Sequence, residues 1–263
     1  MLVDYHMHLR ASDRSSEELD HTVEAIERYV EQAHEHGVYE IGVTEHVYYF
    51  RETRACWALP YQLDRCNEDF GPYCDAVLDA KRRGLPVKLG LEVDWVPERA
   101  DELAAVLEPY PWDYLIGSVH WIGGLAVDQQ PGLWAGRSVE DVWALYAREL
   151  EAAARSGHFD VLAHPDLVKI FADRVEWNWQ PVIDALDGVA LEVSTAGLRK
   201  PVGELYPAAE LLRGGNRITL ASDAHLAEDV GRDFQAAVDH ARAAGFDTVT
   251  VFDRRSSRQE PLG

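Results

Sequence analysis

The feature that most constrains the fold is a repeating order of seven short apolar segments, each separated from the next by a longer segment with helical spacing. The apolar segments are rich in Val, Leu and Ile and do not alternate strictly with polar residues, which is typical of parallel strands buried on both faces. Strands that alternate with helices predict parallel pairing through crossover helices, and therefore an α/β fold. The predicted strands are residues 1–5, 39–43, 87–91, 113–119, 159–163, 189–193 and 218–221.

Every predicted strand ends in polar residues of catalytic type. His6 and His8 follow the first strand, and residues two apart in an extended chain point to the same side. The set of candidate metal ligands at strand ends is His6, His8, His46, Glu92, His120, His164, Asp223 and His225. An open sheet serves its crevice mainly from the strands near the switch point, whereas a barrel gathers the carboxyl ends of all strands around one cavity. We therefore predict a barrel that forms one domain over residues 1–263.

The predicted ligand set indicates a cluster of metal ions. Imidazoles mixed with carboxylates suit divalent Zn, Mn or Fe. Eight ligands are too many for one ion, and Glu92 can bridge two ions through its two oxygens, so we expect two or three ions. Such a cluster fits phosphate ester hydrolysis, because neighbouring ions hold a bridging hydroxide for in-line attack and neutralise charge on the phosphoryl oxygens. Each histidine taken alone is better explained as structural, so the prediction depends on the whole set.

The segments between the strands predict helices and two insertions. We expect helices over residues 15–36, 64–83, 98–107, 138–156, 177–186, 204–213 and 228–244, and a last strand over residues 248–252. Ser15 and Ser138 are the predicted caps of the first and fourth helices. The insertions cover residues 47–63, which are aromatic and basic, and residues 121–137, which are rich in Gly and Trp. Long loops in compact domains are usually functional.

Composition excludes several classes of protein. The formal charge of −21, from 25 Lys and Arg against 46 Asp and Glu, disfavours nucleic acid and anionic membrane surfaces as partners. No apolar stretch is long enough to cross a membrane. The three cysteines, an odd count without zinc-finger spacing or a signal peptide, predict a reducing cytoplasm. The chain lacks a Gly-x-Ser-x-Gly elbow and a glycine-rich loop after the first strand, which disfavours serine hydrolases and nucleotide-binding folds.

The order of these motifs resembles the PHP (polymerase and histidinol phosphatase) superfamily over nearly the whole chain. A further segment, residues 192–200 followed by residues 204–207, is similar to the histidinol-phosphatase branch. The motifs that carry the superfamily resemblance are Asp4-Tyr5-His6-Met7-His8, Gly42-Val43-Thr44-Glu45-His46, Gly90-Leu91-Glu92-Val93-Asp94, Gly117-Ser118-Val119-His120, Ala163-His164-Pro165 and Ser222-Asp223-Ala224-His225.

The resemblance implies a distorted (β/α)7 barrel that holds a metal cluster, usually of three ions. It assigns His6, His8, Glu92 and Asp223 to the first ion, Glu92, His120 and His164 to the second, and His46 and His225 to the third. It makes Arg199 the phosphate clamp and Lys169 a second candidate, and it places Glu92 among the catalytic residues as well as the ligands. Where the family has a further ligand, this chain has Arg14 beside Asp13. Asp13 is the candidate substitute, and His21 is a remoter one.

The predicted activity is that of a metal-dependent phosphomonoesterase which hydrolyses L-histidinol phosphate to L-histidinol and phosphate in histidine biosynthesis. Glu45, Glu52 and Asp94 are candidates to meet the cationic end of this substrate. Another small phosphate ester, such as a nucleotide or sugar phosphate, is the nearest alternative. A metal-dependent amidohydrolase is less favoured because no strand end offers a bridging lysine, and a non-catalytic PHP module because the ligand set is nearly complete. The sequence leaves the metal identity and the oligomeric state open.

Overall fold

The strands form two parallel sheets. The computed structural model describes residues 1–9, 21–129 and 136–263. One sheet has the order β1-β2-β3 and the other the order β10-β9-β8-β5-β4, which confirms the predicted parallel α/β class. Their bounds are β1 (Val3–Asp4), β2 (Glu40–Val43), β3 (Val87–Leu89), β4 (Glu92–Asp94), β5 (Ile116–Ser118), β8 (Val161–Leu162), β9 (Ala190–Ser194) and β10 (Ile218–Ala221).

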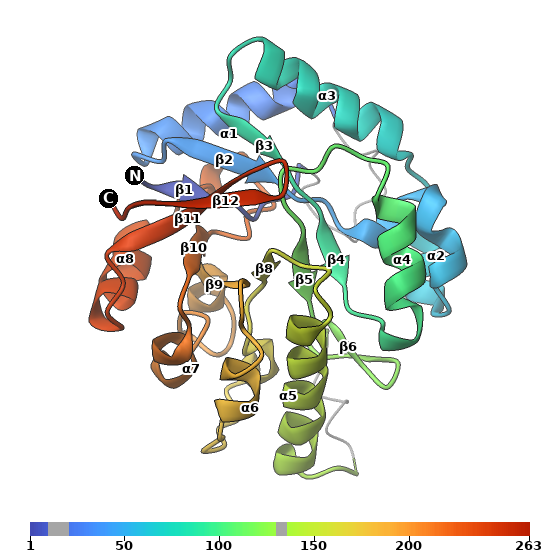
Figure 1. The fold of residues 1–263 in the computed structure, drawn as a ribbon, viewed down its shortest axis with the longest axis vertical. Coiled ribbons are helices and arrows are strands. Elements are labelled where there is room, and N and C mark those ends of the chain that lie inside the picture. The colour runs from blue at the N-terminus through green and yellow to red at the C-terminus, as the bar shows by residue number, and fades with distance from the viewer. Residues whose placement is uncertain (10–20, 130–135) are drawn as a thin grey trace.

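Backbone hydrogen bonds join the edges of the two sheets on both sides. The amide of Tyr5, next to β1, donates to the carbonyl of Leu220 on β10 at 3.0 Å. On the other side, the amide of Glu92 at the start of β4 donates to the carbonyl of Glu45, just past β2, at 3.1 Å. Because β3 and β4 are nearly continuous in the chain, the strands follow one another around a ring with the helices outside it (Figure 1).

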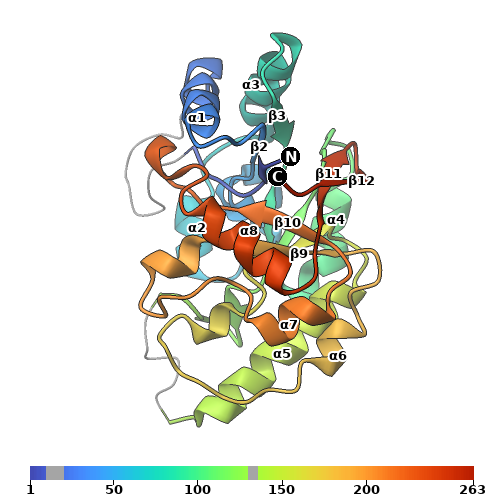
Figure 2. The same cartoon turned by 90° about the vertical axis from the view of Figure 1, so that its left-hand side faces the viewer.

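Helices cover the outer faces of the sheets. Helices α1 and α3 pack against each other and against β2 and β3 (Figure 2). In the described ranges no helix is both long and apolar enough to span a membrane. The α-helices are α1 (Val23–Glu35), α2 (Pro60–Arg65), α3 (Phe70–Arg82), α4 (Ala100–Leu107), α5 (Val139–Arg155), α6 (Gln180–Ile183), α7 (Ala209–Gly214) and α8 (Phe234–Ala243). Short 3-10 helices are η1 (Val47–Tyr49), η2 (Arg51–Cys56), η3 (Pro97–Arg99), η5 (Leu167–Lys169), η6 (Ala196–Arg199) and η7 (Ala227–Asp229).

Helix starts follow local capping where a cap is available. Ser138 caps α5 as predicted, because its hydroxyl accepts from the amide of Asp141 at 3.0 Å. The predicted start of the first helix at Ser15 lies outside the described residues. The described helix α1 begins only at Val23, after Thr22 accepts from the amide of Ala25.

The two insertions contain short regular elements. Residues 47–63 were predicted as a loop, but they form η1, η2 and the start of α2. The predicted helix from residue 64 begins instead at Phe70, because the amides of Asn67 and Glu68 both donate to the carbonyl of Tyr49 and hold this segment out of a helix. The second insertion begins with a small hairpin, β6 (Trp121–Ile122) and β7 (Leu125–Ala126).

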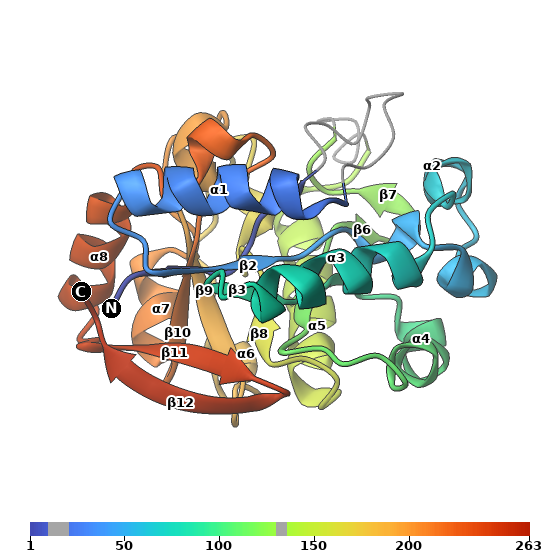
Figure 3. The same cartoon turned by 90° about the horizontal axis from the view of Figure 1, so that it is seen from above.

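A hairpin of β11 (Thr248–Asp253) and β12 (Ser256–Pro261) lies across the amino-terminal ends of the strands (Figure 3). The sequence predicts β11 but not β12, since the latter carries polar residues without an apolar pattern. Phe252 packs against Tyr5 and Tyr114 inside this end of the ring, at centroid distances of 5.9 and 5.3 Å. A glycine at position 42 leaves room for Tyr114, because a Cβ there would lie 1.8 Å from the tyrosine oxygen.

Candidate metal centre

All eight candidate ligands at strand ends lie in one cluster at the carboxyl ends of the strands. His6, His8, Glu92 and His164 are buried, and the other four are partly exposed. Their ligand atoms form four overlapping groups that could each hold an ion. These groups are His6, His8 and Asp223; His6, Glu92 and His164; His46, Glu92 and His120; and His8, His46 and His225.

Glu92 occupies the middle of the cluster, and its two oxygens face different imidazoles. Oε2 lies 2.7 Å from Nδ1 of His46, 3.4 Å from Nε2 of His6 and 3.6 Å from Nε2 of His8. Oε1 lies 3.3 Å from Nε2 of His120 and 3.2 Å from Nε2 of His164. This is the arrangement required of a carboxylate that bridges two ions.

The spacing of these atoms fits a metal ion between them. Two ligands that bind one tetrahedral ion at about 2.1 Å lie about 3.4 Å apart. The contacts of Nε2 of His6 and His8 with Glu92 and Asp223 span 3.4 to 3.7 Å, longer than ordinary hydrogen bonds. Both Nε2 atoms are buried and make no hydrogen bond within the described part of the chain. Buried polar atoms normally have a hydrogen-bond partner, so two unpaired Nε2 atoms at this spacing fit nitrogens that bind a metal ion.

Mutual electrostatics shift the pKa values of the metal-free cluster. Burial alone raises the pKa of Glu92, but the imidazoles of His46, His6 and His120 outweigh it and hold this pKa well below its usual value. Burial lowers the pKa of His8, but the nearby carboxylates of Asp223 and Glu45 raise it to about 9. Burial also lowers the pKa of His120, and the charges of Glu92 and Asp94 raise it to about 10. Without ions, the imidazoles of His8 and His120 are therefore protonated at neutral pH.

Two ligand candidates have left-handed backbone conformations that are rare outside glycine. The φ angle is 26° at His164 and 53° at Asp223. Such conformations cost about 1–3 kcal/mol each and persist where the surroundings impose them, often at functional sites. Both residues directly follow buried strands, so the turn redirects each side chain into the cluster.

A cavity of about 230 Å³ opens directly onto the centre. Besides the ligand candidates, it is lined by Lys200, Asp128, Gln129 and three aromatic residues, which are Tyr48, Tyr61 and Trp121. Lys200 is exposed and Asp128 half-buried, and they bring one cation and one anion to the same cavity. Tyr61 packs against Trp121 at a centroid distance of 5.2 Å.

The predicted phosphate-binding cations lie outside this lining. Arg199 donates to the carbonyl of Ser222 at 2.7 Å, directly before Asp223. Lys169 is buried, 2.8 Å from Asp166, and donates to the carbonyl of Leu205. It faces a separate cavity between α5 and α7.

The predicted contacts for a cationic substrate group also lie elsewhere. Glu45 is buried and accepts from the amide of Leu9, Glu52 accepts from the amide of Phe70, and Asp94 accepts from Nδ1 of His120. Asp13 lies outside the described residues. His21 lies 3.7 Å from Glu45 and belongs to none of the four groups.

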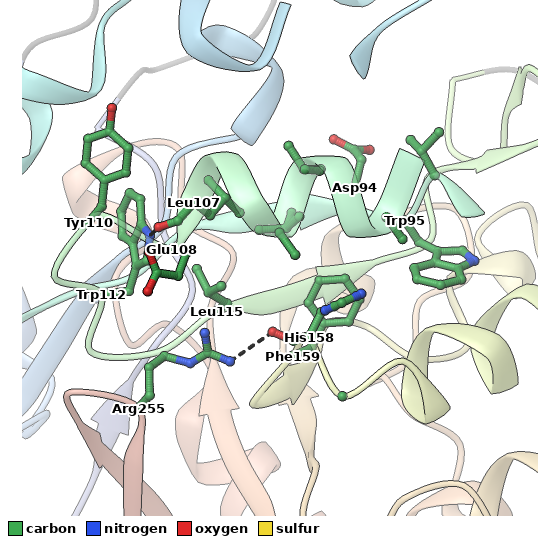
Figure 4. Close-up of a pocket in the computed structure, with 16 residues that line it drawn as sticks. Asp94, Trp95, Leu107, Glu108, Tyr110, Trp112, Leu115, His158, Phe159 and Arg255 are labelled. Carbon is green, nitrogen blue, oxygen red and sulfur yellow. Dashed lines mark hydrogen bonds between the residues drawn. The ribbon is translucent and has the colours of Figure 1, made fainter. Parts of the chain in front are cut away.

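A second cavity, beneath α4, offers a chemically different environment (Figure 4). Its volume is about 300 Å³, and its walls are mainly Leu103, Leu107, Leu115, Trp112 and Phe159. Arg255 lies at its edge and donates to the carbonyl of His158 at 2.9 Å. No candidate metal group of the described chain includes a residue that lines it.

Sequence reasoning missed Lys200, Asp128 and Glu192. A signal existed for Glu192, which is a carboxylate between Leu191 and Val193 in an otherwise apolar strand, because a buried charge needs a partner. Asp128 lies in an insertion that carries no periodic pattern, so no comparable signal marked it. Lys200 belongs to the segment of residues 192–200 that is similar to the histidinol-phosphatase branch, but its neighbour Arg199 was predicted as the phosphate contact.

Comparison with known proteins gives consistent relatives. The model of the PHP domain matches residues 4–196. A protein of Deinococcus radiodurans named "Probable histidinol-phosphatase" is 36% identical over 241 residues, which cover 86% of this chain and 90% of that protein. The crystal structure of histidinol phosphate phosphatase from Lactococcus lactis, complexed with Zn, L-histidinol and phosphate, aligns with a TM-score of 0.72 at 22% identity over 98% of both chains. A solved structure from Listeria monocytogenes has a TM-score of 0.73 at 18% identity, over 89% of this chain and 99% of that one.

Proposed function

Because the chain belongs to the PHP domain family, we propose that it is a metal-dependent phosphomonoesterase that hydrolyses L-histidinol phosphate to L-histidinol and phosphate. The observation that carries the proposal is Glu92, whose two oxygens face separate sets of imidazoles at 2.7 to 3.6 Å. Support for the substrate comes from the Deinococcus relative and from the Lactococcus enzyme complexed with L-histidinol and phosphate.

The residues present fit two or three divalent ions, and we propose Zn, Mn or Fe. Imidazole nitrogens and carboxylate oxygens suit all three metals. When bound, such ions lower the pKa of a water molecule and neutralise negative charge on a phosphoryl group. The third group, His8, His46 and His225, offers three imidazoles and no carboxylate in the described chain. Asp13 remains the proposed additional ligand there.

The other residues of the cavity supply substrate binding. Lys200 is the proposed contact for a phosphate oxygen, because it is the exposed cation in the lining. Arg199 stays a proposed second contact, since it is anchored beside Asp223. Asp128 is the proposed partner of the ammonium group of the substrate. Tyr61 and Trp121 provide an aromatic wall that suits a flat imidazole and excludes water from it.

We place the reaction in histidine biosynthesis in the cytoplasm, carried out by one domain that spans residues 1–263. The free cysteines Cys56, Cys66 and Cys74 are all buried and support a reducing compartment. A small phosphorylated molecule is the proposed partner, and nucleic acid is not, because of the net charge of −21.

The test is phosphate release from a panel of esters by the zinc- or manganese-loaded protein. We expect kcat/KM for L-histidinol phosphate to exceed that for a nucleoside monophosphate and a sugar phosphate by about 100-fold or more, since a site that pairs a substrate cation discriminates strongly against analogues without it. A chelator should abolish the activity. An Asp128→Asn variant should lose this preference while retaining turnover of the sugar phosphate. Equal rates on all three esters, or activity unaffected by the chelator, would contradict the proposal.

A further inference from the structure

Buried carboxylates outside the four metal groups support several imidazoles of the centre. Oε2 of Glu192, on β9, lies 2.7 Å from Nδ1 of His6. Oδ1 of Asp94, on β4, lies 2.9 Å from Nδ1 of His120. Both carboxylates are at most 1% exposed. Carboxylates in this position fix the orientation and the tautomer of a metal-binding histidine.

We propose that Glu192 is a positioning residue with two roles: it sets the tautomer of His6, and it holds His164 in place. His6 and His164 are the imidazoles that face the two different oxygens of Glu92. The inference rests on the metal binding of the proposed function and adds a residue that supports two ligands at once.

The tautomer follows from hydrogen-bond chemistry. An ionised carboxylate only accepts hydrogen bonds, so Nδ1 of His6 carries the proton toward Glu192. Nε2 then keeps its lone pair. It is this Nε2 atom that lies 3.4 Å from Glu92 and 3.7 Å from Asp223, where an ion would bind.

The second oxygen of Glu192 acts on the opposite side of the centre. Oε1 accepts from the backbone amide of His164 at 3.1 Å. His164 is the residue with a φ of 26°, and its Nε2 lies 3.2 Å from Oε1 of Glu92. One buried carboxylate thus accepts from His6, just past β1, and from the turn that presents His164 after β8.

A glutamine at position 192 cannot make both contacts. If its oxygen accepts from the His164 amide, its NH₂ faces Nδ1 of His6 and forces the proton onto Nε2, the atom needed for the ion. If the amide is reversed, its NH₂ opposes the His164 N–H. The substitution keeps the shape of the side chain, so its effect reports the hydrogen-bond pattern and the charge.

Asp94 provides a matched comparison with a different pattern. Its Oδ1 accepts from both His120 Nδ1 and Trp121 Nε1, the latter at 3.0 Å. Its Oδ2 makes no hydrogen bond within the described part of the chain. An asparagine can place its oxygen at the Oδ1 position and keep both contacts.

The experiment compares zinc binding by Glu192→Gln and Asp94→Asn in the full chain, by titration calorimetry and by the metal content of the purified proteins. We expect zinc affinity to fall about 10–100-fold in Glu192→Gln, and at most a few fold in Asp94→Asn. Asp69→Asn, at a side chain that is 53% exposed and ion-paired with Arg51, is the neutral control. Unchanged affinity in Glu192→Gln, or an equal loss in Asp94→Asn, overturns the proposal.

A measurement on the unmodified protein decides the matter if Glu192→Gln does not fold. Nitrogen-15 NMR of the zinc-loaded protein should show His6 protonated at Nδ1 and zinc-bound through Nε2. The opposite assignment overturns the proposal. Neither readout involves turnover, so a protein that passes both tests but does not hydrolyse L-histidinol phosphate would refute the proposed activity alone.

Discussion

Two cavities of similar size differ in almost every chemical respect. The metal cavity, of about 230 Å³, is lined by imidazoles and carboxylates. Among their buried atoms, Nδ1 of His46 and His164 and Oε2 of Glu92 lack hydrogen bonds within the described chain. The cavity beneath α4, of about 300 Å³, is enclosed mainly by leucine and aromatic side chains (Figure 4). Apolar walls cost packing energy and polarise no bond. The charged or ionisable residues that also line this cavity, Asp94, Glu108, His158 and Arg255, belong to none of the candidate metal groups of the described chain. The difference teaches that the lining, and not the volume, identifies the reactive site.

The largest effect should come from the metal cavity. Glu92→Gln keeps the shape of the side chain but removes the negative charge that the surrounding imidazoles face. It should lower kcat/KM for the phosphate ester by about 10³-fold or more, because metal stabilisation of a transition state is worth several kcal/mol. Phosphate release and metal content measure the effect. If the variant kept both its rate of phosphate release and its metal content, the metal cavity would not be the reactive site that the comparison identifies.

The apolar cavity should respond in stability and not in catalysis. Leu103 is 2% exposed and lines this cavity. Leu103→Ala should lower the free energy of unfolding by about 2–5 kcal/mol, because it removes buried methyl groups and enlarges the void. Urea unfolding measures this loss, with kcat/KM of the folded variant as the control. A loss of kcat/KM comparable to that of Glu92→Gln would mean that the cavities are coupled.

The metal cavity should also show a pH dependence that the other lacks. In the metal-free protein the pKa values of His8, about 9, and His120, about 10, lie above the ordinary value, so both imidazoles are protonated at pH 7. His8 and His120 belong to different candidate metal groups, so an ion in either group displaces one of these two protons. This displacement should raise zinc affinity about 10-fold per pH unit near pH 7 and level off above pH 9 to 10. Calorimetry in buffers of different ionisation enthalpy counts the protons released when zinc binds. A count of zero would contradict the raised pKa values of His8 and His120.

The same shifts determine how stability depends on pH. A raised histidine pKa stabilises the metal-free protein fully below about pH 6.5, and this stabilisation is lost as pH rises through 9 and 10. Urea unfolding of the metal-free protein at pH 6.5 and pH 10 should show this decrease. Zinc-loaded protein, in which these imidazoles are neutral at both pH values, should not show this contribution.

The smallest effect should come from filling the apolar cavity. Ala104 on α4 is partly buried and lines it. Ala104→Leu should raise the free energy of unfolding by about 0.5–2 kcal/mol, as cavity-filling substitutions do, with kcat/KM unchanged. Thermal unfolding measures the gain. A loss of stability would show that the cavity has less room than its volume indicates, and Ala104→Val then provides the smaller test.

The sequence predicted the position of the strands and of the eight candidate ligands because both follow from local pattern. The predicted strand over residues 218–221 coincides with β10, since four apolar or β-branched residues precede a polar turn. What it could not predict depends on contacts distant in the chain. Residues 66–69 are not helical because the carbonyl of Tyr49 accepts from the amides of Asn67 and Glu68, and β12 forms only against β11. The sequence alone does not distinguish Lys200 from its neighbour Arg199. Only the fold determines which of two adjacent cations lines the cavity.

The union of β1 with β10 has a consequence for how the molecule is made. The amide of Tyr5 reaches the carbonyl of Leu220, and the amide of Asp223 the carbonyl of His6. His6 and His8 precede Asp223 and His225 by more than two hundred residues in the chain. During synthesis, the candidate metal group of His6, His8 and Asp223 therefore cannot assemble until the chain has been extended past residue 223.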